Sequence, residues 1–195
     1  MRRMNHGDAM SRYLVFDTET GGLDPLAHDL LSMGCVASED GRILDAVEIL
    51  IRHEPYRVSA GGMKVNRIDL VKHHAVALEP VEALRVFDTF CGKHFGNAPI
   101  TLLGHNIAFD QGFLGTFLRS QGRDIEPRFH HRSIDTHAAA AVLRDAGRLP
   151  SDLRLGSGAL FSFFDIAPAP ELRHTALGDA IATHHLYWKL VERAR

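Results

Sequence analysis

The stretch SRYLVFDTETGGLD, residues 11–24, decides the fold of this chain. Its apolar run, residues 13–16, predicts a strand that is buried on both faces, and the glycines at 21–22 end that strand. Asp17 and Glu19 are two residues apart, so a strand directs both carboxylates to the same face. Neighbouring carboxylates that lose hydration need compensation, and a divalent cation is the simplest candidate. The ordinary alternative is a strand end that emerges into solvent.

Composition bounds the class of protein. With 195 residues, 45% of them hydrophobic, we expect one domain over residues 11–195 after a disordered leader at residues 1–10. The leader lacks the hydrophobic centre of a signal peptide and no apolar run is long enough to span a bilayer, so we expect a cytoplasmic protein with no membrane partner. Cys35 and Cys91 lack metal-ligand spacing and are expected to be free, buried thiols. The formal net charge of −2 gives no global nucleic-acid footprint, although metal ions would change the local field of a carboxylate site.

Hydrophobic periodicity and turn residues predict a mixed sheet covered by helices. Strands are expected at residues 13–16, 30–37, 42–52, 99–103 and 129–134, the second and third forming a hairpin. Helices are expected from Pro80 onward, at 107–121 with Asn106 as N-cap, and at 136–146, 153–164 and 175–194. Residues 55–69 are expected to be irregular, with a short helical turn at 65–69. An early hairpin followed by βα units implies a three-layer α/β domain with a mixed five-stranded sheet.

Two further acids could join Asp17 and Glu19 at the carboxyl end of the sheet, where such folds place their ligands. Asp110 lies one turn into the helix after the fourth strand, although a first-turn acid is common without any function. Asp179 lies among apolar residues of the last helix, so we do not expect its side chain to be exposed to solvent. His174 and Asp179 would be about 140° apart on one helix. They can converge if His174 lies in the preceding loop and Thr175 caps the helix.

Three motifs together resemble a known family. DTETGGL at 17–23, HNIAFD at 105–110 and HTALGDA at 174–180 are similar to the exonuclease motifs of the DEDDh family, which contains the bacterial polymerase proofreading subunit, ribonuclease T and oligoribonuclease. The resemblance covers roughly residues 12–191. It implies a ribonuclease H-like fold and 3′→5′ exonuclease activity with two Mg²⁺ or Mn²⁺ ions per active site.

The resemblance also implies roles for individual residues. Asp17, Glu19, Asp110 and Asp179 would be the metal-binding quartet, with Asp17 shared by both ions and Asp110 on the leaving-group side. His174 would be the general base that takes the proton of the attacking water. Leu23 would wedge against the terminal base. Substrate contacts would come from this residue and from Thr20, Gly21, Met63, Asn66, His105, Asn106 and Phe109.

Several tempting residues have more ordinary interpretations. An aromatic on an apolar helix face, such as Phe109 or Phe113, is usually core. Asp135 lacks a partner acid and is expected to be structural or to support the site from behind the residues that contact the metal. Histidine pairs at 73–74, 130–131 and 184–185 lack zinc-site spacing and are expected at the surface. A solvated face is expected for four arginines, namely Arg119, Arg123, Arg128 and Arg132.

We therefore expect an exonuclease that hydrolyses DNA or RNA from the 3′ end and releases nucleoside 5′-monophosphates. The alternative is a non-catalytic nucleic-acid-binding or scaffold module with the same fold. Because the chain ends with its last helix, we expect no tail for association with a polymerase. The choice between DNA and RNA, the preference for single or double strands, and the oligomeric state stay open.

Overall fold

A computed structural model describes residues 11–124 and 128–195, so the predicted leader at residues 1–10 lies outside the described residues. Its sheet has the strand order β3-β2-β1-β4-β5. The β1–β2 and β2–β3 pairs are antiparallel, and β4 runs parallel to both β1 and β5. This arrangement confirms the predicted mixed five-stranded sheet and its early hairpin. The strands are β1 (Arg12–Thr20), β2 (Leu30–Glu39), β3 (Arg42–Leu50), β4 (Leu102–Gly104) and β5 (Ile134–Asp135).

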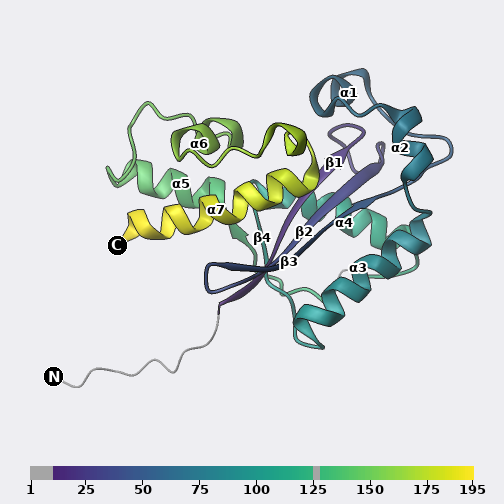
Figure 1. Cartoon of the computed structure of the whole chain (residues 1–195), viewed down its shortest axis with the longest axis horizontal. Coiled ribbons are helices and arrows are strands. Elements are labelled where there is room, and N and C mark those ends of the chain that lie inside the picture. Colours follow the sequence, from purple (N-terminus) through teal and green to yellow (C-terminus); the bar gives the residue numbers. More distant parts are fainter. Residues whose placement is uncertain (1–10, 125–127) are drawn as a thin grey trace.

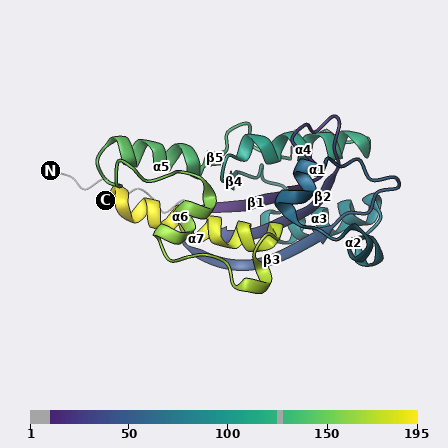
Figure 2. The same ribbon diagram turned by 90° about the horizontal axis from the view of Figure 1, so that it is seen from above.

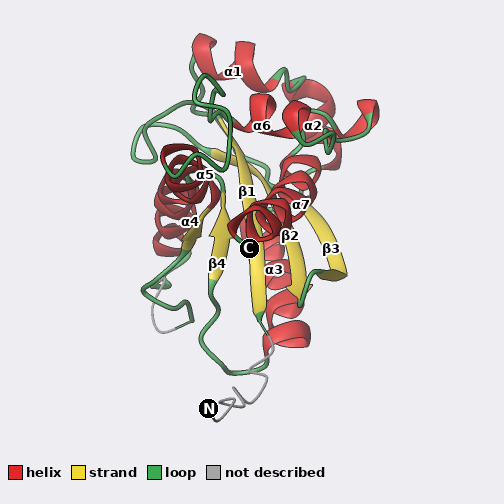
Figure 3. Ribbon diagram, turned by 90° about the vertical axis from the view of Figure 1, so that its left-hand side faces the viewer, coloured by secondary structure: helices red, strands yellow, loops and turns green. Residues whose placement is uncertain are grey.

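Helices cover both faces of the sheet, which confirms the three layers (Figures 1 and 3). Figure 3 shows α7 in front of the strands and α3 behind them. Figure 2, from above, places α1 beside the end of β1. None of the helices in the described ranges is long and apolar enough to cross a membrane. The helices are α1 (Ala60–Asn66), α2 (Leu70–Val76), α3 (Pro80–Phe95), α4 (Ile107–Ser120), α5 (Thr136–Asp145), α6 (Ser157–Phe163) and α7 (Ala176–Ala194), with a 3₁₀ turn η1 at Pro170–Leu172.

The two faces of β1 have different partners. Leu14 and Phe16 belong to the core formed with α3 and α4, whereas Val15 belongs to the cluster that contains Ala180 of α7. Since side chains alternate along a strand, Asp17 and Glu19 continue the row beneath α7, and Thr18 continues the row toward α4. The strand thus presents its two acids to the same helix layer.

A glycine lets α7 approach the sheet. Gly34 of β2 pairs with Asp17 on one side and with Glu48 of β3 on the other. A β-carbon at Gly34 would overlap the backbone carbonyl of Ala176, the first residue of α7. Backbone therefore lies directly against backbone at this point, and the first turn of α7 is fixed over the row that contains Asp17.

The segment between β3 and α3 differs from its prediction. A helix covers Ala60–Asn66 rather than residues 65–69, and α2 was not predicted. Side-chain caps explain both helices, because Ser59 accepts from the Gly62 N–H, and Asp69 accepts from the N–H groups of Val71 and Lys72. The Ser59 cap offsets the low helix propensity of the two glycines inside α1.

Other boundaries also differ. The predicted strand at 129–134 is reduced to two residues, with one isolated bridge between Phe129 and Ile100. The helix predicted from residue 153 begins at Ser157, directly after Gly156. Asn106 stands at the N-cap position of α4, as predicted, but it has a left-handed backbone (φ 59°) and its side chain makes no cap hydrogen bond.

Candidate active site

Three carboxylates meet at the end of β1. Asp17, Glu19 and Asp179 each offer an oxygen, and these oxygens lie within 4.8 Å of one another. Asp179 reaches them from the first turn of α7, whose N-cap Thr175 accepts a hydrogen bond from the Gly178 N–H (3.0 Å). Among the described residues, this is the one group of three or more acidic, histidine or cysteine side chains with metal-like spacing.

Asp110 approaches from the other face of the sheet. It is buried near the start of α4, and Thr18 Oγ1 donates a 2.6 Å hydrogen bond to its Oδ1. It is not part of the 4.8 Å group, yet it lines the same cleft of about 420 Å³ as Asp17, Glu19 and Asp179. The structure thus brings all four predicted acids to one cleft, three of them in close contact and the fourth held by Thr18.

Burial and mutual repulsion hold these acids in an unfavourable electrostatic environment. Burial raises the pKa of Asp17 well above its usual range, and the charges of Asp110, Asp179 and Glu19 raise it further. Burial, with a smaller contribution from Asp179, raises the pKa of Glu19 to about 8. The pKa of Asp110 rises to about 7, mainly through burial, although the Thr18 hydrogen bond opposes the rise. A cation bound between the carboxylates would favour their ionised forms and so offset these shifts.

His174 lies at the rim of this cleft. It is exposed, has a left-handed backbone (φ 60°), and immediately precedes the Thr175 cap of α7. The loop position therefore removes the angular conflict between His174 and Asp179, and both residues line the cleft. His174 is close enough for its charge to lower the pKa of Asp179, which burial raises.

Several predicted substrate residues are bound instead by their own chain. Asn66 is buried; its Nδ2 donates to the Thr20 carbonyl (2.9 Å) and its Oδ1 accepts from the Ile68 N–H (3.0 Å). Thr20 Oγ1 donates to the Gly22 carbonyl (2.7 Å), and the Gly21 carbonyl accepts from Ser59. These contacts fasten α1 to the loop after β1.

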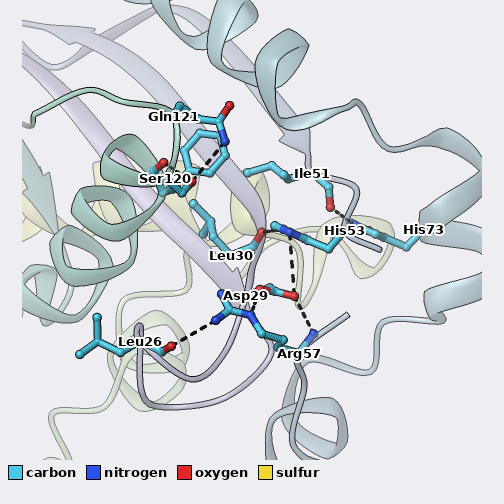
Figure 4. A network of polar contacts seen from close by, with 10 residues as sticks. Leu26, Asp29, Leu30, Ile51, His53, Arg57, His73, Ser120 and Gln121 are labelled. Carbon is cyan, nitrogen blue, oxygen red and sulfur yellow. Dashed lines mark hydrogen bonds and ion pairs between the residues drawn. The ribbon is translucent and has the colours of Figure 1, made fainter. Parts of the chain in front are cut away.

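A buried acid anchors the same loop. Two hydrogen bonds from Arg57, from its backbone N (2.6 Å) and its Nε (2.8 Å), reach the Asp29 carboxylate, and His53 Nδ1 lies 3.9 Å from it (Figure 4). Arg57 also donates to the Leu26 carbonyl (3.2 Å), and the Asp29 carbonyl accepts from the Gly21 N–H (2.8 Å). The turn beside the carboxylates is therefore a fixed part of the scaffold.

An apolar hollow of about 430 Å³ adjoins the carboxylate cleft, with Glu19, Leu23, Val65 and Phe109 among its lining residues. Leu23 is 84% exposed and Val65 is 73% exposed, so both present apolar surface to solvent. Phe109 is half-buried and lines both hollows, whereas Phe113 is a core residue, as expected of an aromatic on an apolar helix face.

The remaining predicted contacts have mixed positions. His105 lines the carboxylate cleft, where its Nδ1 lies 3.0 Å from Thr136 Oγ1, and burial lowers its pKa. Asn106 also lines the cleft and is exposed. Met63 is half-buried in α1 and lines neither this cleft nor the apolar hollow.

Asp135 and the histidine pairs were expected to have structural or surface roles, and this is correct for Asp135 but not for every histidine. Asp135 caps α5 by accepting from the His137 and Ala138 N–H groups, and it also accepts from the Asn106 N–H (3.0 Å). The surface prediction for the histidine pairs is wrong for His73 and His184, which are buried. His73 lies in the core because its Nε2 contacts the Ile51 carbonyl at 3.0 Å, and His184 because it is on the inner side of α7.

The predictions for the cysteines and the arginines agree with the structure. Cys35 and Cys91 are free and buried. Arg119, Arg123 and Arg132 are exposed and Arg128 is half-buried, close to the solvated face that was expected.

Sequence reasoning missed four residues that shape the site. Gly34 looked like one more residue of an apolar strand, and Thr18 was merely the residue between two acids. Asp29 carried no motif. Glu48 also carried no motif, but it faces the backbone N–H groups of Ala176 and Leu177 and its charge raises the pKa of Glu19. Only the strand pairing, which joins Glu48 to Gly34, reveals this last position.

Comparison with known proteins finds relatives among bacterial polymerases. PolC-type DNA polymerase III of Halalkalibacterium halodurans is 29% identical over 185 residues, which are 94% of this chain and 12% of that protein. The Lactococcus lactis subsp. lactis protein of the same name is 30% identical over 186 residues, 95% of this chain and 10% of that protein. The chain thus spans about a tenth of the length of these curated relatives. No protein-family model matches it.

Solved exonucleases share the fold. E. coli exonuclease I in complex with a dT13 oligonucleotide superposes with a TM-score of 0.76 at 15% identity, covering 94% of this chain and 41% of that one. Exonuclease X in complex with 5′ overhanging duplex DNA gives a TM-score of 0.63 at 20% identity, covering 91% of this chain and 89% of that one. The fold is therefore ribonuclease H-like, as the motifs implied. The resemblance to the DEDDh family of 3′→5′ exonucleases is confirmed, in sequence by PolC-type polymerases and in fold by exonucleases I and X.

Proposed function

We propose that this chain is a metal-dependent 3′→5′ exonuclease that hydrolyses a nucleic-acid strand from its 3′ end and releases nucleoside 5′-monophosphates. One observation carries the proposal: oxygens of Asp17, Glu19 and Asp179 lie within 4.8 Å of one another, burial raises the pKa of all three, and repulsion between the acids raises those of Asp17 and Glu19 further. Three carboxylates in this state are stable as anions only beside a cation. The similarity to nucleases names the chemistry that such a site performs.

The donor set fits a hard divalent cation such as Mg²⁺ or Mn²⁺, because all of its ligand atoms are carboxylate oxygens. Asp17, Glu19 and Asp179 would hold one ion, and Asp17 with Asp110 a second. Bound ions of this kind activate water and stabilise the charge that develops on a phosphodiester and its leaving oxygen. Thr18 fixes the orientation of Asp110 through its 2.6 Å hydrogen bond.

His174 is suited to accept the proton of the attacking water. Its place in the loop before α7 leaves the ring exposed at the rim of the cleft, close enough to Asp179 to affect its pKa. A neutral imidazole is an effective base near neutral pH. The proton can then pass from His174 to solvent.

The apolar hollow beside the carboxylates is suited to the base of the terminal nucleotide. Leu23 and Val65 present exposed apolar surface to it, and Phe109 lines both the hollow and the cleft. Stacking on such surfaces tolerates any base. Because Asn66, Thr20 and Asp29 hold this hollow rigidly, a 3′ end placed there would have its last phosphodiester over the acids.

Nucleotide release from 5′-labelled strands tests the proposal. Wild-type protein with Mn²⁺ should shorten linear DNA or RNA stepwise from the 3′ end and leave a circular single strand intact. Asp179→Ala should abolish most of the turnover, and Asp152→Ala, which removes an exposed acid outside the cleft, should not. Efficient cutting of the circle would overturn the exonuclease assignment. Binding of the strand without any metal-dependent release would favour the non-catalytic module.

A further inference from the structure

A second hollow adjoins the carboxylate cleft between the end of α1 and the segment that precedes α7. It measures about 530 Å³ and shares Asn66, Arg173 and His174 with the cleft. Arg67, at the end of α1, lines it together with Ile68 and Pro170. The apolar hollow shares Val65, Asn66 and Phe109 with the cleft but neither arginine. The cleft therefore has one apolar and one cationic neighbour.

The two arginines of this hollow have no acidic partner within residues 11–124 and 128–195. Neither guanidinium makes an ion pair or a side-chain hydrogen bond there, and both residues are exposed. By contrast, Arg12, Arg57 and Arg123 each bind a carboxylate of their own chain. The charge of Arg173 lowers the pKa of Asp179, so its field reaches the carboxylates.

One of the two arginines lines the hollow from a backbone conformation that residues with side chains rarely adopt. Arg67 has a left-handed backbone (φ 60°) as the C-cap of α1, where its N–H donates to the Met63 carbonyl. This conformation is unfavourable for a non-glycine residue, whereas glycine would adopt it freely. The turn alone therefore gives no reason for an arginine. His174, on the opposite wall, has the same left-handed conformation.

We propose that Arg67 and Arg173 form a phosphate-binding subsite that holds the linkage on the 5′ side of the scissile bond. The inference rests on the proposed exonuclease function and deepens it. If the terminal base lies in the apolar hollow and the scissile phosphate over the acids, the strand continues past His174 into the cationic hollow. Guanidinium groups bind phosphate oxygens through paired N–H donors, and unpaired ones give up no existing contact to do so. The subsite would also offset the repulsion between an acidic cleft and a polyanion.

The test measures KM and kcat on two single-stranded oligonucleotides that differ at one position. One has ordinary linkages throughout, and its twin has a single uncharged methylphosphonate directly 5′ of the scissile linkage. The enzymes are wild type, the double variant Arg67→Gln/Arg173→Gln, and the control Arg42→Gln. Arg42 is an exposed arginine at the hairpin end of β3, and no ion pair joins it to another described residue.

We expect the double variant to raise KM for the ordinary strand roughly tenfold or more, with a much smaller change in kcat. The slope of log KM against log salt should fall by about 0.7, because the two arginines together neutralise one phosphate of a single strand. The methylphosphonate should raise KM of the wild type but add little in the double variant. Arg42→Gln should behave as wild type, and matching melting temperatures would show that all variants are folded.

Two results would overturn the inference alone: an unchanged KM and salt slope in the double variant, or a full methylphosphonate penalty that persists in it. If the wild type releases no nucleotide from either strand, the proposed function itself fails.

Discussion

The metal-free protein should be destabilised by its own active site, and Glu19→Gln should remove the part of that destabilisation that comes from Glu19. Burial and the neighbouring acids raise the pKa of Glu19 from 4.5 to about 8 in the folded protein. In the unfolded chain this carboxyl titrates near its ordinary value. The folded state therefore favours the protonated form of Glu19. The contribution of this protonated group to the free energy of unfolding is fully present below pH 4.5 and is lost as the pH rises through about 8.

The magnitude follows from the size of the shift. Each pKa unit corresponds to about 1.4 kcal/mol, so full ionisation of Glu19 costs at most about 5 kcal/mol. Solvent contact and screening at this half-buried group reduce the expected cost to about 2–4 kcal/mol. Glutamine keeps the shape of the protonated acid without its charge. The variant should therefore match wild type near pH 4.5 and be more stable by about 2–4 kcal/mol at pH 8.

Urea denaturation in EDTA, at several pH values between 4.5 and 8.5, measures this difference. Saturating Mg²⁺ or Mn²⁺ should then restore the stability of wild type at pH 8, by about 2.7 kcal/mol at a hundredfold excess over Kd, and have a smaller effect on the variant. The control is Glu82→Gln, which removes an exposed acid paired with Arg85 on α3 and should change stability by less than about 1 kcal/mol at any pH. A Glu19→Gln protein that is less stable than wild type in EDTA at pH 8 would refute the reasoning. So would a difference that does not grow with pH.

Three further substitutions test separate parts of the site. His174→Ala should bind both substrate and metal but lower kcat by about 10²–10⁴; a wild-type kcat would contradict the base role. Gly34→Ala should push the first turn of α7 off the sheet and lower kcat by roughly 10²-fold, whereas Gly92→Ala, in open space on α3, should preserve it; equal rates would argue against the close approach. Asp135→Asn should reduce the free energy of unfolding by less than about 1 kcal/mol, since an amide oxygen still caps α5, and keep metal-dependent turnover; a folded variant that no longer binds metal would make Asp135 more than a cap.

Local chemistry made most of the sheet and its long helices predictable. The apolar run before Asp17, the hairpin turn, Pro80 and the Thr175 cap each act within a few residues, and the structure has the corresponding elements. Gly61 and Gly62 misled the prediction for α1, because Ser59 caps that helix and Gly62 lies against the backbone of Gly21. Position 62 requires a glycine because α1 approaches the backbone of Gly21 closely, and this contact between distant parts of the chain has no local sequence signal.

The acids of the site were predictable as a set, but their supports were not. Motif spacing brought Asp17, Glu19, Asp110 and Asp179 to one sheet end, and the structure places them in one cleft. The hydrogen bond from Thr18 to Asp110 spans 92 positions in the chain, which no local pattern encodes. Glu48 likewise reaches the start of α7 only because β2 and β3 pair in a particular register.

The alternation of side chains along β1 accounts for the division of the four acids. Asp17 and Glu19 lie on the face beneath α7, so Asp179 can join them directly, while Thr18 lies on the opposite face and meets Asp110 from α4. Each helix layer thus contributes one acid to the same end of β1. Asp179 of α7 lies beside Asp17 and Glu19, and Asp110 of α4 is hydrogen-bonded to the hydroxyl of Thr18. A one-residue slip in the pairing of β1 would exchange the faces, leaving Thr18 under α7 and both acids toward α4. The bare backbone of Gly34 opposite Asp17 resists that slip, because only this register lets α7 lie close enough to place Asp179.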